Sequence, residues 1–151
     1  MYRWWGSLID AIKEIRLDMI VGVIGSGTMG SGIAQSFASN DFSVSLYDIS
    51  DDMLARALDS INKSLNRMIS KGKVDRETAD ISLKNITTST SIDIISNCDL
   101  IIEAATENIE IKKKIFKNLD EISKPDCILA SNTSSISINE LADVTNRPDK
   151  I

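Results

Sequence analysis

The chain has 151 residues, of which 42% are apolar, and carries a formal net charge of −5 at pH 7. A chain of this length can bury one sizeable core, whereas its acidic balance disfavours nucleic acid and anionic membranes as partners, because phosphate binding requires clustered positive charge. The sequence contains no histidine, which excludes histidine-based acid–base chemistry and most zinc sites within these residues.

Residues 1–18 differ in pattern from the rest of the chain. Apolar residues recur there at spacings of three and four, as on a short amphipathic helix: Trp4, Trp5, Leu8, Ile12 and Ile15. Three interpretations stay open, namely an extension upstream of a start at Met19, a packing helix, and a membrane-surface anchor, which the balanced charges disfavour. We therefore predict an atypical extension over residues 1–18 and an α/β domain over residues 19–151.

From residue 20 onward, short apolar strands alternate with amphipathic segments. Strands are predicted at residues 20–24, 44–47, 86–89, 100–102 and 127–130. Helices are predicted at residues 33–39, 50–71 and 109–122, and a capping box over Ser137–Glu140 predicts one more short helix. Residues 73–85 are polar, and either a helix or a loop fits them. This alternation predicts a parallel sheet with helices on both faces.

The first strand is followed by a glycine-rich loop, Gly25-Ser26-Gly27-Thr28-Met29-Gly30. Its G-x-G-x-x-G pattern, between an apolar strand and a helix, is typical of dinucleotide binding in a doubly wound Rossmann fold. Gly25 permits a tight turn, Gly27 lets the backbone approach a pyrophosphate, and Gly30 lets helix and strand pack closely. The helix N-terminus offers free N–H groups to the phosphates. The alternative is a structural turn without a ligand.

An acidic residue, Asp48, ends the second predicted strand 18 residues after Gly30. A carboxylate at this place accepts hydrogen bonds from the adenosine ribose hydroxyls and repels the 2′-phosphate of NADP. The alternative role of capping the next helix suits Ser50 better. The pattern therefore predicts NAD rather than NADP as the cofactor.

Two cysteines, Cys98 and Cys127, stand at no spacing typical of metal ligands. With no sign of secretion, we interpret them as reduced, buried thiols of a cytoplasmic protein that binds no metal. No apolar run approaches the ~18 residues of a transmembrane helix, so the sequence predicts no membrane span.

Four segments in order resemble the 3-hydroxyacyl-CoA dehydrogenase family, especially bacterial 3-hydroxybutyryl-CoA dehydrogenases. They are residues 25–35, 100–112 (LIIEAATENIEIK), 130–135 (ASNTSS) and 146–151 (NRPDKI). The similarity runs from about residue 20 to residue 151, outside the N-terminal extension. It implies an α/β Rossmann fold with a doubly wound parallel sheet, here truncated before the sixth strand and the helical C-terminal domain.

The resemblance also implies site residues. Ala105, Glu107 and Lys112 are expected to contact the ribose and nicotinamide side of the cofactor, and Ser134 to hydrogen-bond the substrate's C3 oxygen beside the nicotinamide. Plainer alternatives exist: Glu107 in the first turn of a helix, Lys112 on a solvated face, and Ser134 as a turn residue. These positions follow the carboxyl ends of strands, where open α/β sheets bind ligands.

A second group of expected contacts lies on the helix of residues 50–71. Ser64, Arg67 and Lys71 are spaced three and four apart and share a face. In the family, the residues that match Ser64 and Lys71 meet the coenzyme A moiety of the substrate. The alternative for Lys71 is a cation that stabilises the helix C-terminus.

The activity implied by the resemblance is NAD-dependent oxidation of short-chain L-3-hydroxyacyl-CoA by hydride transfer. The family's catalytic histidine and its helical, dimer-forming domain are expected beyond Ile151, so the 151 residues are expected to bind NAD but to be nearly inactive. An acyl-CoA substrate and a homodimer of the full-length enzyme follow from the same resemblance. Two alternatives stay open: a non-catalytic or crystallin-like NAD-binding module, and another Rossmann dehydrogenase of the 3-hydroxyisobutyrate type.

Overall fold

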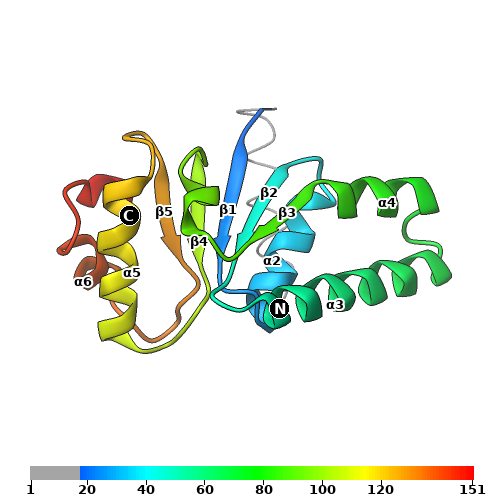
Figure 1. Cartoon of the computed structure of the whole chain (residues 1–151), viewed down its shortest axis with the longest axis horizontal. Helices are drawn as coiled ribbons and strands as arrows, with labels where there is room; N and C mark the ends of the chain where they lie inside the picture. Colours follow the sequence, from blue (N-terminus) through cyan, green and yellow to red (C-terminus); the bar gives the residue numbers. More distant parts are fainter. Residues whose placement is uncertain (1–17) are drawn as a thin grey trace.

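In the described part of the chain, five parallel strands form one sheet in the order β3-β2-β1-β4-β5. The computed structural model describes residues 18–151, so the helix predicted within residues 1–17 lies outside the described part. The strands are β1 (Ile20–Ile24), β2 (Ser43–Tyr47), β3 (Ile86–Ser89), β4 (Leu100–Glu103) and β5 (Ile128–Ser131) (Figure 1). This arrangement confirms the predicted α/β Rossmann fold, and it makes β3 and β5 the edge strands among those described.

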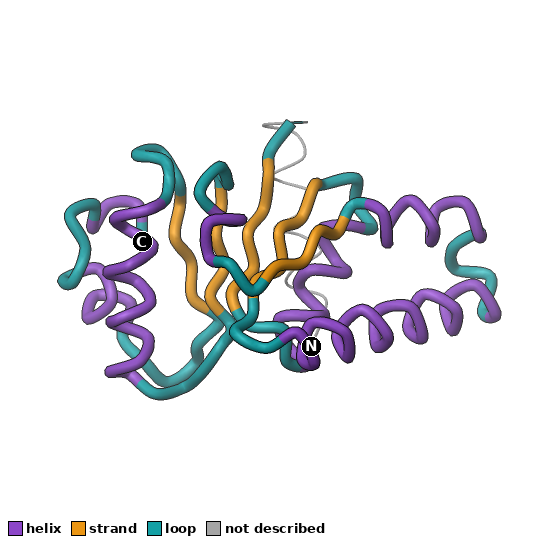
Figure 2. The backbone as a smooth tube through the Cα atoms, in the orientation of Figure 1, coloured by secondary structure: helices purple, strands orange, loops and turns teal. Residues whose placement is uncertain are grey.

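The helices are α2 (Thr28–Ala38), α3 (Asp51–Ser70), α4 (Arg76–Lys84), α5 (Ile109–Ile122) and α6 (Ile138–Ala142). Two short 3₁₀ helices, η1 (Ile92–Ile95) and η2 (Pro148–Lys150), complete the described chain. The α3 and α4 helices extend together to one side of the sheet, whereas α5 and α6 lie at the other side (Figures 1 and 2). None of the helices in residues 18–151 is long and apolar enough to cross a bilayer.

Several predicted helix boundaries needed correction. The first helix begins at Thr28, five residues before its predicted start, because the glycine loop leads straight into it with Gly27 as the N-cap. The polar segment left open is the helix α4, which the Asp75 carboxylate caps by accepting from the Thr78 N–H at 2.7 Å. The short helix α6 forms as predicted but without the capping box: the Ser137 side chain makes no cap bond, and the Glu140 carboxylate instead pairs with Lys113.

Two separate apolar cores cover the two faces of the sheet. Residues 21 and 23 of β1 belong to one core, which packs beneath α2, α3 and α4 and includes the fully buried Phe37. Residue 24 of β1 belongs to the other, which packs beneath α5, α6 and η1 and includes the fully buried Phe116. Successive side chains of a strand point to opposite faces, so both faces of the central strand must be apolar.

The two cysteines are free and buried, as the sequence predicted. Cys98 lies two residues before β4 and Cys127 directly precedes β5, so both are at the amino-terminal edge of the sheet. Burial raises the pKa of each thiol to about 11. Since the thiolate is the nucleophile and the metal ligand, neither thiol is suited to either role near neutral pH. Among the described residues, no group of acidic, cysteine or histidine side chains could hold a metal ion.

A buried carboxylate ties the last described residues to the C-terminal end of α5. Asp120 accepts from the Asn146 backbone N–H at 2.8 Å and from the Arg147 Nε at 2.6 Å, and Arg147 also donates to the carbonyl oxygens of Asp120 and Lys124. Burial by itself would raise the pKa of Asp120, but the hydrogen bonds from Asn146 and Arg147 outweigh it and lower the pKa below its ordinary value of 3.8. The pair therefore stabilises the fold only while Asp120 is ionised.

We predict that Asp120→Ala lowers the free energy of unfolding at pH 7 by about 3 kcal/mol, at the lower end for a broken buried pair because Arg147 reaches solvent. A carboxyl whose folded pKa is depressed contributes stability above its unfolded pKa, and this contribution is lost as the pH falls through the folded pKa. The difference between the parent chain and the variant should therefore shrink below pH 3.8 in urea titrations. Asp143→Asn, at an exposed neighbouring carboxyl, is the control and should change little. A difference that stays constant down to pH 3 contradicts the assignment.

Candidate functional site

A cleft of about 710 Å³ opens at the carboxyl-terminal edge of the sheet. Its walls come from the glycine loop, the end of β2, the loop between β4 and α5, and one side of α5. The lining residues are Ile24, Gly25, Ser26, Gly27, Tyr47, Asp48, Ile49, Ser50, Met53, Ile92, Ala104, Ala105, Thr106, Ile111, Lys114, Ile115 and Asn118. This is the edge at which doubly wound sheets bind ligands, and its size is that of a small-molecule site.

The three glycines of the loop differ in what surrounds them. Gly25 has a φ of +93°, and a Cβ there would lie 2.6 Å from the Cα of Ala105. A Cβ at Gly30 would lie 1.8 Å from the carbonyl oxygen of Gly25. At Gly27 a Cβ would meet no atom within 4 Å, so the space above this residue is open. The first and third glycines are thus required by the protein's own packing, whereas the second leaves room for something outside it.

The loop residues between the glycines have different surroundings. Thr28 lines a second, neighbouring groove rather than the main cleft, and Met29 lines neither of the two. Ser26 lines the cleft, but it is buried, and both its backbone N–H and its hydroxyl donate to Asp48 Oδ2 at 2.8 Å. No sequence pattern indicates this bond, since it joins residues 22 positions apart.

Asp48 lies directly beside the glycine loop in the wall of the cleft. Besides its two bonds from Ser26, its Oδ1 accepts from the Ser50 N–H at 3.2 Å. It does not cap α3: that role belongs to Ser50, whose hydroxyl accepts from the Met53 N–H. Asp48 is therefore held at the end of β2 with its carboxylate in the wall of the cleft.

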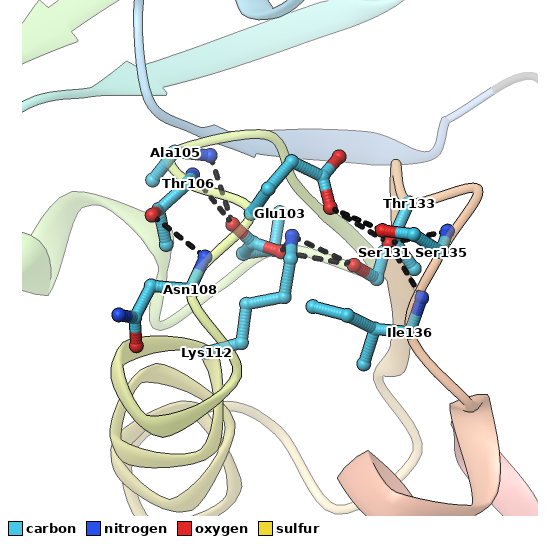
Figure 3. A network of polar contacts seen from close by, with 10 residues as sticks. Glu103, Ala105, Thr106, Asn108, Lys112, Ser131, Thr133, Ser135 and Ile136 are labelled. Atoms are coloured by element: carbon cyan, nitrogen blue, oxygen red, sulfur yellow. Dashed lines mark hydrogen bonds and ion pairs between the residues drawn. The ribbon is translucent and has the colours of Figure 1, made fainter.

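A buried charged network lies beneath the loop between β4 and α5 (Figure 3). Glu103, the last residue of β4, and Lys112 of α5 form an ion pair, and both side chains are 0% exposed. The other carboxylate oxygen of Glu103 accepts from the N–H groups of Ala105 at 2.8 Å and Thr106 at 3.4 Å. The Ser131 hydroxyl donates to Glu103 at 2.9 Å and accepts from Lys112 at 3.2 Å. Every charged atom of this buried network thus has a partner.

The structure gives Lys112 a different place from either expectation. It is not on a solvated face, because the side chain is fully buried. Nor does it line the cleft as a cation open to a ligand, because its ammonium group is engaged by Glu103 and Ser131. The physical reason is that an unpaired ammonium cannot be buried at acceptable cost, and Glu103 supplies the opposite charge. Sequence reasoning missed Glu103, whose only signal was an acidic residue at the end of an apolar strand.

The loops after β4 and β5 are also joined at the surface. Glu107 accepts from the hydroxyls of Thr133 at 2.9 Å and Ser135 at 3.4 Å. Its alternative place in the first turn of α5 is wrong, because Asn108 caps that helix and Glu107 precedes the cap. Ser134 lies between the two bonded residues and is exposed, and Ala105 is exposed on the facing loop. The structure therefore brings Ala105, Glu107 and Ser134 to one side of the carboxyl-terminal edge.

The two residues expected to contact coenzyme A, Ser64 and Lys71, do not line the same groove in the structure. A groove of about 380 Å³ runs between α2 and α3, and Ser64 and Arg67 line it together with Gln35. Lys71, the C-cap of α3, is exposed and does not line this groove. The shared helix face brings Ser64 and Arg67 together, but it does not extend the groove as far as Lys71.

Comparisons with known proteins agree with one another. Residues 20–151 match the family model described as 3-hydroxyacyl-CoA dehydrogenase, NAD binding domain. The chain is 45% identical over 133 residues to the 3-hydroxybutyryl-CoA dehydrogenase of Clostridioides difficile. The aligned region covers 88% of this chain and 47% of that protein. It is also 45% identical over 131 residues to the 3-hydroxyadipyl-CoA dehydrogenase of Escherichia coli K12, covering 87% of this chain and 28% of that protein.

Solved structures are similar over the same region. The (S)-3-hydroxybutyryl-CoA dehydrogenase of Ralstonia eutropha superposes with a TM-score of 0.86 at 44% identity, over 88% of this chain and 47% of that one. The chain thus spans less than half the length of these relatives.

We predict opposite effects for one added methyl group at two glycines of the loop. Gly30→Ala should destabilise the fold by more than about 3 kcal/mol, because the methyl overlaps a backbone oxygen that cannot move aside. Gly27→Ala should leave stability unchanged or raise it by about 0.4–1 kcal/mol, because its φ of −66° suits alanine and the space is open. Thermal unfolding followed by circular dichroism compares the two. Equal losses in both variants would contradict this account of the loop.

Proposed function

Because the chain belongs to the 3-hydroxyacyl-CoA dehydrogenase family, of which it carries the NAD-binding domain, we propose that it forms the cofactor half of an enzyme oxidising short-chain L-3-hydroxyacyl-CoA. The domain occupies residues 19–151, and 3-hydroxybutyryl-CoA is the proposed substrate. The observation that carries the proposal is the cleft beside the glycine loop, with open space above Gly27 and a carboxylate at Asp48.

In this proposal the loop of residues 25–30 holds the pyrophosphate of NAD. Gly27 leaves the space, and the N-terminus of α2 supplies unpaired N–H groups and the positive end of the helix dipole. Asp48 accepts hydrogen bonds from the ribose hydroxyls. These bonds replace one of the hydrogen bonds that it accepts from Ser26. Ile49 and Met53, both exposed in the cleft wall, offer apolar contact to the adenine ring.

The nicotinamide half then lies toward β4 and β5. Ala105, Glu107 and Ser134 are the proposed contacts there, and their nearness in the structure supports this role. Lys112 does not line this part of the cleft; it pairs with Glu103, which in turn holds the loop after β4. The coenzyme A moiety of the substrate is proposed to meet Ser64 in the groove between α2 and α3, with Lys71 as a surface cation at the end of the same helix.

Bound NAD would accept the hydride that leaves C3 of the substrate. The residues of this chain orient that reaction: Ser134 donates to the C3 oxygen, and the loops after β4 and β5 fix its distance from the cofactor. The proton of the C3 hydroxyl needs a base with a pKa near neutrality, a task typical of histidine. The chain contains no histidine, so we propose that the base belongs to residues other than these. We also propose, from membership of the family, that the full-length enzyme is a homodimer whose contacts lie outside these residues.

A cytoplasmic location is part of the same proposal, since both cysteines are free thiols. The absence of histidine from the 151 residues keeps a second candidate, an NAD-binding module without catalytic function.

We predict that the chain binds NADH at least about tenfold more tightly than NADPH, because a charged hydrogen bond contributes about 1.5–3 kcal/mol and Asp48 repels a 2′-phosphate. Asp48→Ala should remove this preference. Ser26→Ala is the matched control: it removes the internal partner but keeps the carboxylate, so the preference should remain. Titrations followed by NADH and NADPH fluorescence measure both constants. Equal constants in the parent chain would refute the proposed role of Asp48.

We also predict that the 151-residue chain oxidises 3-hydroxybutyryl-CoA at least about 100-fold more slowly than a full-length relative, since a general base contributes about 10²–10⁴-fold. NADH formation at 340 nm, per mole of protein, measures this. Turnover comparable to that of the Clostridioides difficile enzyme would mean that a base exists within these residues. Binding of NADH without any detectable turnover, even when residues of the relative's remaining half are supplied, would favour the non-catalytic module.

A further inference from the structure

Glu103 joins three different elements, the most distant of which lies 28 residues along the chain. Its carboxylate contacts the loop after β4 through the N–H groups of Ala105 and Thr106, α5 through Lys112, and β5 through Ser131. It is fully buried and lies at the carboxyl-terminal end of its strand. One carboxylate thus fixes the relative position of two loops, each of which begins at this point (Figure 3).

Stability alone is a weak reason for such a pair. Burying two charges carries a desolvation penalty that their attraction only partly repays, and well-packed apolar residues of similar volume are often equally stable. The apolar core of β4 continues to the residue before Glu103, because Ile101 and Ile102 are both buried. The change from apolar to charged side chains therefore occurs where β4 reaches the ligand edge.

The two loops that Glu103 connects carry the residues on one side of that edge. Ser131 begins the loop that presents Ser134 three residues later, and the same loop is tied to Glu107 by Thr133. The glycine loop packs against Ala105 of the β4 loop, but its own hydrogen bonds go to the end of β2, because Gly25 N–H donates to the Tyr47 carbonyl oxygen and Ser26 donates to Asp48, each at 2.8 Å. A disturbance at Glu103 would therefore reach the β4 and β5 loops more than the glycine loop.

In doubly wound folds, the two halves of a dinucleotide lie over the two halves of the sheet. Asp48 at the end of β2 marks the half that takes the adenosine ribose, which leaves β4 and β5 for the other half. We propose that Glu103, with Lys112 as its counter-ion, is a positioning residue that sets the β4 and β5 loops for the nicotinamide half of the cofactor. This inference rests on the proposed NAD site, and it concerns a residue that is fully buried and does not line the cleft.

The test compares NADH with ADP-ribose, which lacks the nicotinamide, in the 151-residue chain. Glu103→Gln should weaken NADH binding about tenfold, equivalent to about 1.4 kcal/mol, while the Kd for ADP-ribose changes less than about twofold. Ser131→Ala is a milder second variant that keeps the ion pair and should fold normally. It should weaken NADH binding about fivefold, the value of one ordinary hydrogen bond, and again spare ADP-ribose. Titration calorimetry measures all of these constants.

Asp99→Asn is the matched control for general destabilisation. Asp99 is also a carboxylate in an ion pair, with Lys124 at 2.7 Å, but it precedes β4 at the opposite edge of the sheet. The control should lower the melting temperature and leave the ratio of the two dissociation constants unchanged. A parent chain that binds neither ligand refutes the proposed NAD site. With both ligands bound by the parent chain, an unchanged ratio in Glu103→Gln and Ser131→Ala overturns the positioning role.

Discussion

The arrangement of the ligand edge depends on how closely α2 crosses the end of β1. A single methyl group at Gly30 would overlap the carbonyl oxygen of Gly25, so the backbones of helix and turn are in direct contact. This contact fixes where α2 begins, and the helix therefore presents its unpaired N–H groups to the cleft. The turn itself requires Gly25, because its backbone has a positive φ and Ala105 lies against it. Strand, turn, helix and facing loop are thus positioned by these two close approaches.

The two edges of the sheet have different chemistry. At the amino-terminal edge, Cys98 and Cys127 are buried and their raised pKa values keep them protonated near neutral pH. At the carboxyl-terminal edge, Ser26, Glu103 and Lys112 are buried polar groups, each with hydrogen-bond partners. A buried polar group costs free energy unless it is paired, so its place in a fold is restricted by the partners available. The chain matches an NAD-binding domain, and doubly wound sheets bind their ligands at this second edge.

Much of this was predictable from local sequence, because the signals involved are local. The alternation of apolar strands and amphipathic helices predicted the parallel sheet, and the glycine pattern predicted the turn before α2. Ser50 was recognised as a helix cap from its position alone, and the structure confirms it. The boundaries that failed were those decided by neighbours: α2 starts five residues early because the turn itself enters the helix, and Ser137 lacks the predicted cap bond.

The sequence by itself determined the fold class, the family and the residues of the glycine turn, because periodicity and motif spacing are written along the chain. Only the tertiary structure decided which polar groups meet one another. Lys112 matched a solvated surface or a ligand contact equally well in the sequence, and Glu103 attracted no attention. Folding brings them into contact across the β4–α5 loop. It also places Ser131, which is 28 residues from Glu103 in the sequence, in hydrogen-bonding contact with both. Partners this far apart leave no periodic trace, since their pairing depends on the packing of α5 and β5 against β4.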